Sequence, residues 1–200
     1  MGTKSKKQII TSIIFVAVLV ALDQITKLLA VVFLKNQNPI PIIKDVFELQ
    51  YLENTSAAFG SDPISLLHNI FTFEIFDSNP ELFLQVRMGF FVLLTIVMVC
   101  LFALLYIRIP SDDKHFVFLD YIIIFFTAGA IGNFIDRITQ QYVVDFLYFK
   151  LIDFPIFNVA DIYVTCAAIT VLALGIFYYK DEDFERIFPS KSKEKKEHKA

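Results

Sequence analysis

Residues 9–34 read IITSIIFVAVLVALDQITKLLAVVFL, and this apolar run decides the class of the protein. A bilayer core of about 30 Å requires roughly 20 apolar residues in a helix, so the run is long enough to cross it. Lysines precede it, as in a cleavable signal peptide, but it is too long and lacks a small-residue cleavage site, so we expect it to be retained. Three more runs approach or exceed spanning length: Val86–Ile107, Phe116–Ile135 and Val159–Tyr179.

The composition agrees with a membrane protein. Hydrophobic residues make up 56% of the 200 residues and charged residues only 20%, and the mean hydropathy is +0.60. A soluble domain of this size could not bury that much apolar surface. Cys100 and Cys166 each lie inside an apolar run, so the sequence supports neither a disulfide framework nor a cysteine metal site.

Basic residues in the short flanks predict the orientation. With four spans, they all fall on one side, which is cytoplasmic by the positive-inside rule. The residues concerned are Lys4–Lys7, Arg108, Lys114 and Lys180. Both termini are then cytoplasmic, and residues 35–85 and 136–158 lie outside. The charge pattern reflects topology and does not indicate a nucleic-acid partner.

The outer segments contain two further predicted elements. Val46–Leu52 alternates apolar and polar residues, which predicts a strand, and residues 63–85 mix phenylalanines with acids, which predicts an interfacial amphipathic helix. We therefore expect one integral membrane domain over residues 1–180, with an extracytoplasmic insert at about 35–85. Residues 181–200 are expected to form a charged cytoplasmic tail that stays solvated or touches anionic lipid.

Charged residues inside the spans require a partner or a function, because each costs roughly 2.5 to 3.5 kcal/mol at the span centre. Asp23 and Lys27 are four residues apart, so they share one helix face in the outer part of the bilayer. A self-contained ion pair, with Lys27 snorkelling outward, explains this spacing as well as a functional role does.

Other polar residues are expected at the same depth on the same side. Taken singly, each has an ordinary explanation: Arg137 as an interfacial anchor, Asp145 as a solvated loop acid, and Asp161 as an acid in the first turn of the last span. Their convergence favours a shared site. The converging residues are Asp23, Lys27, Asn54, Asn133, Arg137, Asp145, Asn158 and Asp161.

Two close carboxylates permit amide hydrolysis without a metal or covalent intermediate. They share one proton, so one acid activates water while its protonated partner polarises the scissile carbonyl. The sequence has no HExxH motif or glycine-rich phosphate loop, and His68, His115 and His198 are scattered. Ser56 lacks an obvious histidine base, which makes a serine mechanism a poor fit.

Five motifs between residues 23 and 161 carry a family resemblance: DQITK at 23–27, NTSAAF at 54–59, GNFIDR at 132–137, VVDF at 143–146 and FNVAD at 157–161. Their order and residue types resemble those of the lipoprotein signal peptidases, also called signal peptidase II. In that family the last two blocks bear the catalytic aspartates. Each motif is weak alone, but together they are highly specific.

The resemblance implies a helical membrane fold of four transmembrane helices, a small extracytoplasmic β-cradle and a mobile interfacial helix. It implies a peptidase of the bacterial cytoplasmic (inner) membrane, which we expect to be a monomer that needs no cofactor or metal. That enzyme would cleave prolipoproteins before a diacylglyceryl-modified cysteine near the outer face, with Asp145 and Asp161 as the dyad. Substrate-binding or supporting roles follow for Asp23, Lys27, Asn54, Ser56, Asn133, Asp136, Arg137 and Asn158.

One departure and two alternatives accompany the resemblance. The family usually has glycine where this chain has Ser56, which could alter the fit of substrate. The phenylalanine-containing segment 61–84 is expected to act as a lid. A presenilin-type intramembrane protease would need a Gly-x-Gly-Asp-like block and more spans, whereas a transporter or channel would be expected to show repeats or broken helices.

Overall fold

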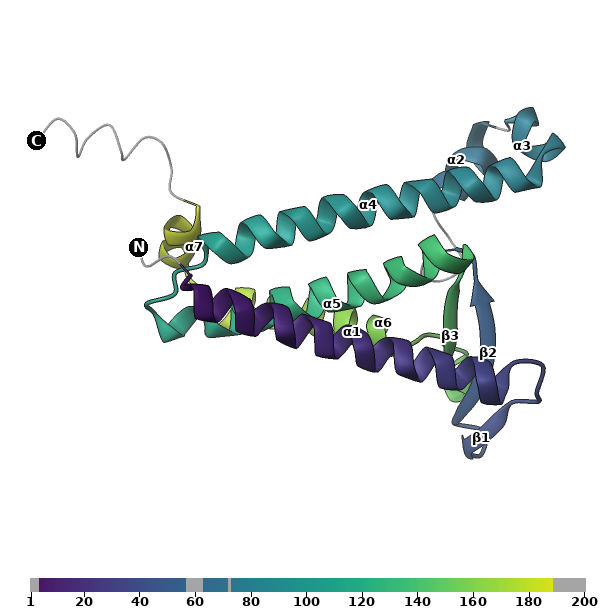
Figure 1. Ribbon diagram of the computed structural model, residues 1–200, viewed down its shortest axis with the longest axis horizontal. Helices are drawn as coiled ribbons and strands as arrows, with labels where there is room; N and C mark the ends of the chain where they lie inside the picture. Colours follow the sequence, from purple (N-terminus) through teal and green to yellow (C-terminus); the bar gives the residue numbers. More distant parts are fainter. Residues whose placement is uncertain (1–3, 57–62, 72, 189–200) are drawn as a thin grey trace, which may run out of the picture.

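The computed structural model describes residues 4–56, 63–71 and 73–188 (Figure 1). Within these ranges, four helical segments are long and apolar enough to cross a membrane, which confirms the predicted helical membrane fold. They are α1 (Lys6–Leu34), α4 (Pro80–Arg108), α5 (Val117–Gln140, preceded by the short helix η2, Lys114–Phe116) and α6 (Val159–Phe177). The described chain ends lie at one end of this bundle, and the β-sheet lies at the other (Figure 1).

Local capping fixes where the spans begin. The Ser5 side chain accepts from the backbone N–H of Gln8 and closes a capping box that starts α1. Asn79 caps α4 and Pro80 occupies its first turn, so this helix begins earlier than the predicted Val86. Asn158 caps α6 through the backbone N–H of Asp161, where the sequence predicts the start of the last span.

Helix α5 is central and contacts α1, α4 and α6. Its approach to α6 depends on small residues, because a Cβ at Gly129 would lie 2.6 Å from the Ala160 carbonyl oxygen. A Cβ at Gly132 would lie 2.5 Å from Asp23 Oδ2 of α1. Small residues let membrane helices pack with their backbones close together, and here that packing brings polar residues of α1, α5 and α6 into one cluster.

Three antiparallel strands form a small sheet at the far end of the bundle, in the order β1 (Ile40–Ile43), β2 (Phe47–Asn54) and β3 (Val143–Tyr148). The predicted strand Val46–Leu52 corresponds to β2, whereas β1 was not predicted. A register shift between Leu49 and Leu52 places Leu52 opposite Asp145. This register brings the end of β2 to the acid on β3.

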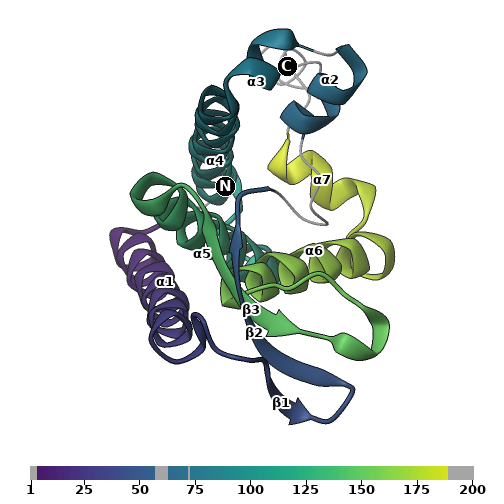
Figure 2. The ribbon, with the colours of Figure 1, turned by 90° about the vertical axis from the view of Figure 1, so that its right-hand side faces the viewer.

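The predicted interfacial segment forms two short helices, α2 (Pro63–Phe71) and α3 (Glu74–Ser78), which both contact α4. Figure 1 and Figure 2 show them beside the start of α4, at the same end of the bundle as the sheet but on the other side of that end. The apolar side chains of Leu66, Leu67 and Ile70 are exposed on α2. The single helix expected over residues 63–85 is therefore divided into α2, α3 and the start of α4, and its position at the membrane interface stays a prediction.

The beginning of the predicted charged tail differs from the expectation. Residues 181–187 form helix α7 (Asp181–Ile187), and Ile187 is buried in a cluster with Ile109, Phe116 and Tyr179. A hydrogen bond between Asp183 and His115 and an ion pair between Arg186 and Asp113 complete the attachment. Apolar residues among the charges therefore anchor this part of the chain. Residues 189–200 of the predicted tail lie outside the described residues.

Candidate active site

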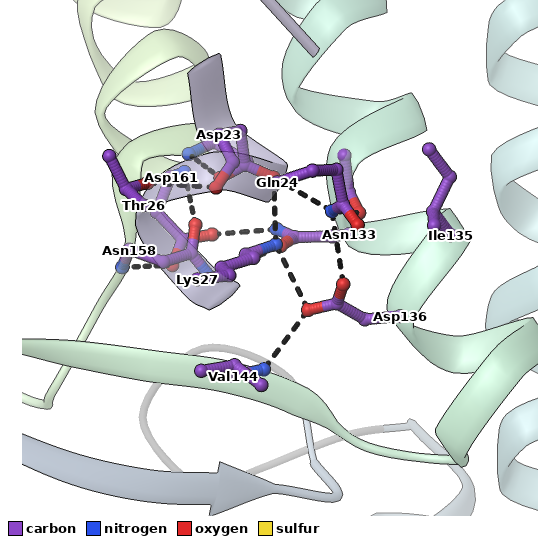
Figure 3. A network of polar contacts seen from close by, with 12 residues as sticks. Asp23, Gln24, Thr26, Lys27, Asn133, Ile135, Asp136, Val144, Asn158 and Asp161 are labelled. Atoms are coloured by element: carbon purple, nitrogen blue, oxygen red, sulfur yellow. Dashed lines mark hydrogen bonds and ion pairs between the residues drawn. The ribbon is translucent and has the colours of Figure 1, made fainter. Parts of the chain in front are cut away.

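The polar cluster begins with a buried acid and a buried lysine on α1 (Figure 3). Asp23 is fully buried and Lys27 is 3% exposed, and Lys27 Nζ lies 3.0 Å from Asp23 Oδ2. Asp23 Oδ1 also accepts from the backbone N–H of Ala160 in the first turn of α6, at 2.9 Å. The ion pair expected from the spacing exists, but Lys27 points into the bundle and does not snorkel.

Asp136 joins α1, α5 and β3. Its Oδ2 lies 3.1 Å from Lys27 Nζ and accepts from the backbone N–H of Val144 at 3.0 Å. Gln24 Nε2 donates to Asp136 Oδ1 at 3.0 Å and to the Gly132 carbonyl oxygen at 3.1 Å. Val144 directly precedes Asp145 in β3, so the contact with Asp136 fixes the backbone that carries that acid.

Asn133 links the cluster to Asp161. Its Oδ1 accepts from Lys27 Nζ at 2.8 Å, and its Nδ2 donates to Asp161 Oδ1 at 2.8 Å. Because the lysine occupies the amide oxygen, the amide NH₂ must face the acid. A supporting side chain on α1 thus orients a carboxyl on α6 through one asparagine.

Asn158 connects the two acids. Its Nδ2 donates to Asp145 Oδ1 at 2.6 Å and to Asn133 Oδ1 at 3.1 Å. Its backbone N–H donates to Asp161 Oδ2 at 3.1 Å. Asp161 therefore takes part in a helix cap, as the ordinary explanation of this residue proposed, and it also belongs to a cluster with a second carboxyl.

The remaining oxygen of Asp145 faces the end of β2. Asn54 Nδ2 donates to Asp145 Oδ2 at 2.7 Å. The Asn54 Oδ1 atom accepts from the backbone N–H of Ser56 at 2.9 Å and from the Ser56 hydroxyl at 3.1 Å. Asp145 is only 2% exposed, so it is not a solvated loop acid.

Burial, followed by the nearby charge of Asp161, raises the pKa of Asp145 from 3.8 to about 7. Hydrogen bonds from Asn54 and Asn158 favour the carboxylate and oppose this rise. A carboxyl that exchanges its proton near neutral pH is suited to general acid–base chemistry.

Arg137 lies one helical turn beyond Asn133. Its Nη1 donates to the Asn133 carbonyl oxygen at 3.4 Å, and its Cζ lies 4.6 Å from the centroid of the Phe91 ring on α4. Cation–π contact holds the guanidinium over this ring. Arg137 therefore anchors α5 against α4, and it also lies in the wall of the site cavity.

A cavity of about 830 Å³ opens beside the two acids. Its polar wall is formed by Asn54, Ser56, Asn133, Arg137, Asp145 and Asp161. The rest of the wall is mostly apolar and comes from the loop after β3 and from α6. The apolar residues include Phe149, Ile152, Phe154, Phe157, Ile162 and Val164.

The structure brings together all ten site residues predicted from the sequence. Six line the cavity, while Asp23, Lys27, Asp136 and Asn158 lie behind it and hold the others. Sequence reasoning missed Gln24, which occupies an unassigned position inside the first motif, and the apolar loop 149–157, whose aromatic content was the available signal. Among the described residues, no group of three or more His, Cys, Asp or Glu side chains could hold a metal ion.

Comparison with known proteins gives a consistent result. Residues 15–177 match the family described as signal peptidase (SPase) II. The chain is 38% identical over 161 residues to a lipoprotein signal peptidase of Brevibacillus brevis, covering 80% of this chain and 91% of the relative. A lipoprotein signal peptidase of Caldanaerobacter subterraneus is 36% identical over 167 residues, covering 83% and 96%.

Solved structures resemble the fold as well. A bacterial membrane enzyme superposes with a TM-score of 0.65 at 27% identity, covering 90% of this chain and 99% of the other. A second bacterial membrane enzyme structure gives a TM-score of 0.62 at 26% identity, covering 90% and 98%. The similarity therefore extends over 90% of this chain.

Proposed function

Because this chain belongs to the signal peptidase II family, whose members remove signal peptides from lipoproteins, we propose that Asp145 and Asp161 are its catalytic dyad. The substrate in this proposal is a prolipoprotein, cleaved directly before its diacylglyceryl-modified cysteine. Membership of this family argues against both alternatives, a presenilin-type protease and a transporter or channel.

A single observation carries the dyad assignment. Asn158 donates from its side chain to Asp145 and from its backbone to Asp161, so one residue holds both carboxyls at the same cavity wall. Two carboxyls that interact in one buried site share one proton, because both cannot ionise cheaply there. The raised pKa of Asp145 supports such sharing near neutral pH.

The proposed reaction is hydrolysis of one amide bond. The ionised carboxyl takes a proton from water while the water oxygen attacks the scissile carbonyl carbon. The protonated carboxyl donates a hydrogen bond to the carbonyl oxygen and stabilises the negative charge that develops there. When the carbon–nitrogen bond breaks, a proton passes from the dyad to the departing amine, and the singly protonated pair is restored.

The neighbouring amides maintain this geometry. Asn54, Asn133 and Asn158 use their NH₂ groups on the dyad. Neutral donors hold the acids in place without adding a full charge that would keep both ionised. Lys27 compensates Asp23 and Asp136, whose positions behind the cavity suit a supporting role.

The apolar wall suits the lipid-modified part of the substrate. Loop 149–157 and α6 line the cavity with large hydrophobic side chains directly beside the acids. Burial of a diacylglyceryl group against such a wall contributes about 0.8 kcal/mol per CH₂. The substrate would thus be bound through its acyl chains at the apolar part of the cavity wall and cleaved at the dyad.

The proposed location is the bacterial cytoplasmic membrane, with the dyad near the outer face and both termini in the cytoplasm. The described N-terminal residue Lys4 pairs with Asp120 near the start of α5, and α7 packs on the same end. The basic flanks therefore gather at the end opposite the sheet, as the positive-inside rule requires of a cytoplasmic side.

We also propose that α2 and α3 act as a lid over bound substrate. No described residue of this segment lines the cavity, and its exposed apolar residues are free to cover an acyl chain. Deletion of residues 61–84 should reduce cleavage at least tenfold, about 1.4 kcal/mol in the barrier. Unchanged cleavage by a folded deletion variant would refute the lid.

Cleavage of a diacylglyceryl-modified prolipoprotein by the purified protein tests the dyad. Asp145→Asn and Asp161→Asn should each abolish cleavage, because an amide cannot exchange a proton in this range. Asp45→Asn makes the same chemical change in an exposed turn between β1 and β2, and it should leave the rate unchanged.

The outcomes test the dyad, the lipid requirement and the peptidase activity separately. Residual activity in either site variant would remove that acid from the mechanism. Equal cleavage of a substrate that lacks the diacylglyceryl group would refute the lipid requirement while leaving the dyad intact. A folded wild-type protein that cleaves neither substrate would refute the proposed activity.

A further inference from the structure

Ser56 occupies a position at which the lipoprotein signal peptidases usually have glycine. The backbone does not demand glycine here, because Ser56 is not among the described non-glycine residues with positive φ. Those residues are Asn36, Asp45, Gln141 and Asp153. Serine therefore fits without strain, and what it adds to the site is a Cβ and a hydroxyl group.

The added hydroxyl acts on the Asn54 side chain. Asn54 Oδ1 accepts from both the Ser56 backbone N–H, at 2.9 Å, and the Ser56 hydroxyl, at 3.1 Å. An amide oxygen has two acceptor sites, so these two donors occupy it fully. Turning the amide over would place its NH₂ against two donors and its oxygen against the Asp145 carboxylate, so only one orientation is favourable.

The Asp161 side of the site has a parallel arrangement. Asn133 Oδ1 also accepts from two donors, Lys27 Nζ at 2.8 Å and Asn158 Nδ2 at 3.1 Å. Its NH₂ then faces Asp161 at 2.8 Å, as that of Asn54 faces Asp145 at 2.7 Å. Each acid is thus held by an asparagine whose oxygen is doubly anchored, and Ser56 provides both anchors on the Asp145 side.

We propose that Ser56 is a positioning residue, whose hydroxyl locks the Asn54 amide and thereby fixes the Asp145 carboxyl for the dyad. This inference rests on the proposed peptidase function. Ser56 lies in the cavity wall, but its hydroxyl contacts Asn54, which in turn contacts Asp145. The proposed role of Ser56 is therefore to orient the acid.

Substitution of the hydroxyl tests the inference through the pH profile of cleavage. Ser56→Ala keeps the backbone donor and the Cβ but loses the second anchor. The hydrogen bond from Asn54 lowers the pKa of Asp145, so weakening it should move the active pH range upward, on the order of half a pH unit. We expect kcat to fall about 3- to 10-fold while KM stays within about twofold.

Two matched variants complete the design. Ser56→Thr retains a hydroxyl and should restore the wild-type profile, whereas Ser56→Gly should behave like the alanine variant. In an Asn54→Ala background, Ser56→Ala should shift the profile no further, because the side chain through which it acts is gone.

The outcomes distinguish positioning from other roles. An unchanged pH profile in Ser56→Ala overturns the inference. A raised KM with unchanged kcat and profile also overturns it, because that result assigns the hydroxyl to substrate binding.

A second readout does not depend on cleavage. Stability contributed by protonated Asp145 is lost as pH rises through its folded pKa, so Ser56→Ala should move this loss to higher pH in thermal unfolding. If the wild type cleaves nothing, the proposed function fails, yet this unfolding shift still decides whether Ser56 positions Asp145. Its absence would overturn the inference.

Discussion

Replacing Lys27 with methionine should strongly destabilise the protein. Lys27 Nζ lies 3.0 Å from Asp23 and 3.1 Å from Asp136, and these acids are 0% and 3% exposed. Methionine has nearly the same length but no charge, so it leaves two buried carboxylates without their cation. Breaking a buried pair in this way costs roughly 3 to 5 kcal/mol.

The expected loss is large enough to measure by thermal unfolding. For a chain of this size, 1 kcal/mol corresponds to about 2 to 4 °C, so Tm should fall by about 6 to 20 °C. The chain has no tryptophan, so helix circular dichroism in detergent is the suitable signal. Lys35→Met is the matched control, because Lys35 ends the same helix in an ion pair with Glu53 whose side chains are 41% and 40% exposed. It should change stability by no more than about 1 kcal/mol.

A compensating variant decides whether charge is the cause. Lys27→Met combined with Asp23→Asn returns the α1–α5 charge balance to its original value and should recover at least half of the lost Tm. The Asn oxygen can still accept from the backbone N–H of Ala160. A single variant that melts within about 2 °C of wild type, or a double variant no more stable than the single one, would refute the reasoning.

Three further predictions concern stability. The folded pKa of Asp145 is raised from 3.8 to about 7, so the folded state becomes less stable as pH rises through this range. Between pH 4 and pH 8, the free energy of unfolding of the wild type should therefore fall by roughly 3 to 4 kcal/mol relative to that of Asp145→Asn. Parallel dependences of Tm on pH in the two proteins would contradict this. Gly129→Ala should lower the free energy of unfolding by about 1 to 3 kcal/mol, because the added Cβ meets the Ala160 carbonyl oxygen. Gly89→Ala is the control and should not lower stability, because the space around Gly89 is open. Equal Tm values for the two variants would contradict this prediction. Ile187→Ala should lower the free energy of unfolding by about 2 kcal/mol, because it leaves a cavity under α7, and it should preserve cleavage. An unchanged Tm would mean that α7 is not held by this contact.

Much of the site was predictable because its residues are unusual for their surroundings. Asp23 and Lys27 interrupt an apolar span, and Asp145 interrupts an apolar strand, so each required a partner. The order of the five motifs then identified the family. The partners were not predictable, because the same i, i+4 spacing fits both a snorkelling Lys27 and the inward Lys27 that reaches Asn133.

The sequence by itself determined the four spans, the membrane environment and the identity of the polar residues, because bilayer thickness sets span length and charges inside lipid are costly. Only the tertiary structure decided how these residues meet. The close α5–α6 packing at Gly129, the strand register that sets Leu52 opposite Asp145, and the fold of residues 181–187 onto the bundle all depend on contacts between distant segments. Such contacts are selected by shape and hydrogen-bond geometry in three dimensions, which local sequence patterns do not encode.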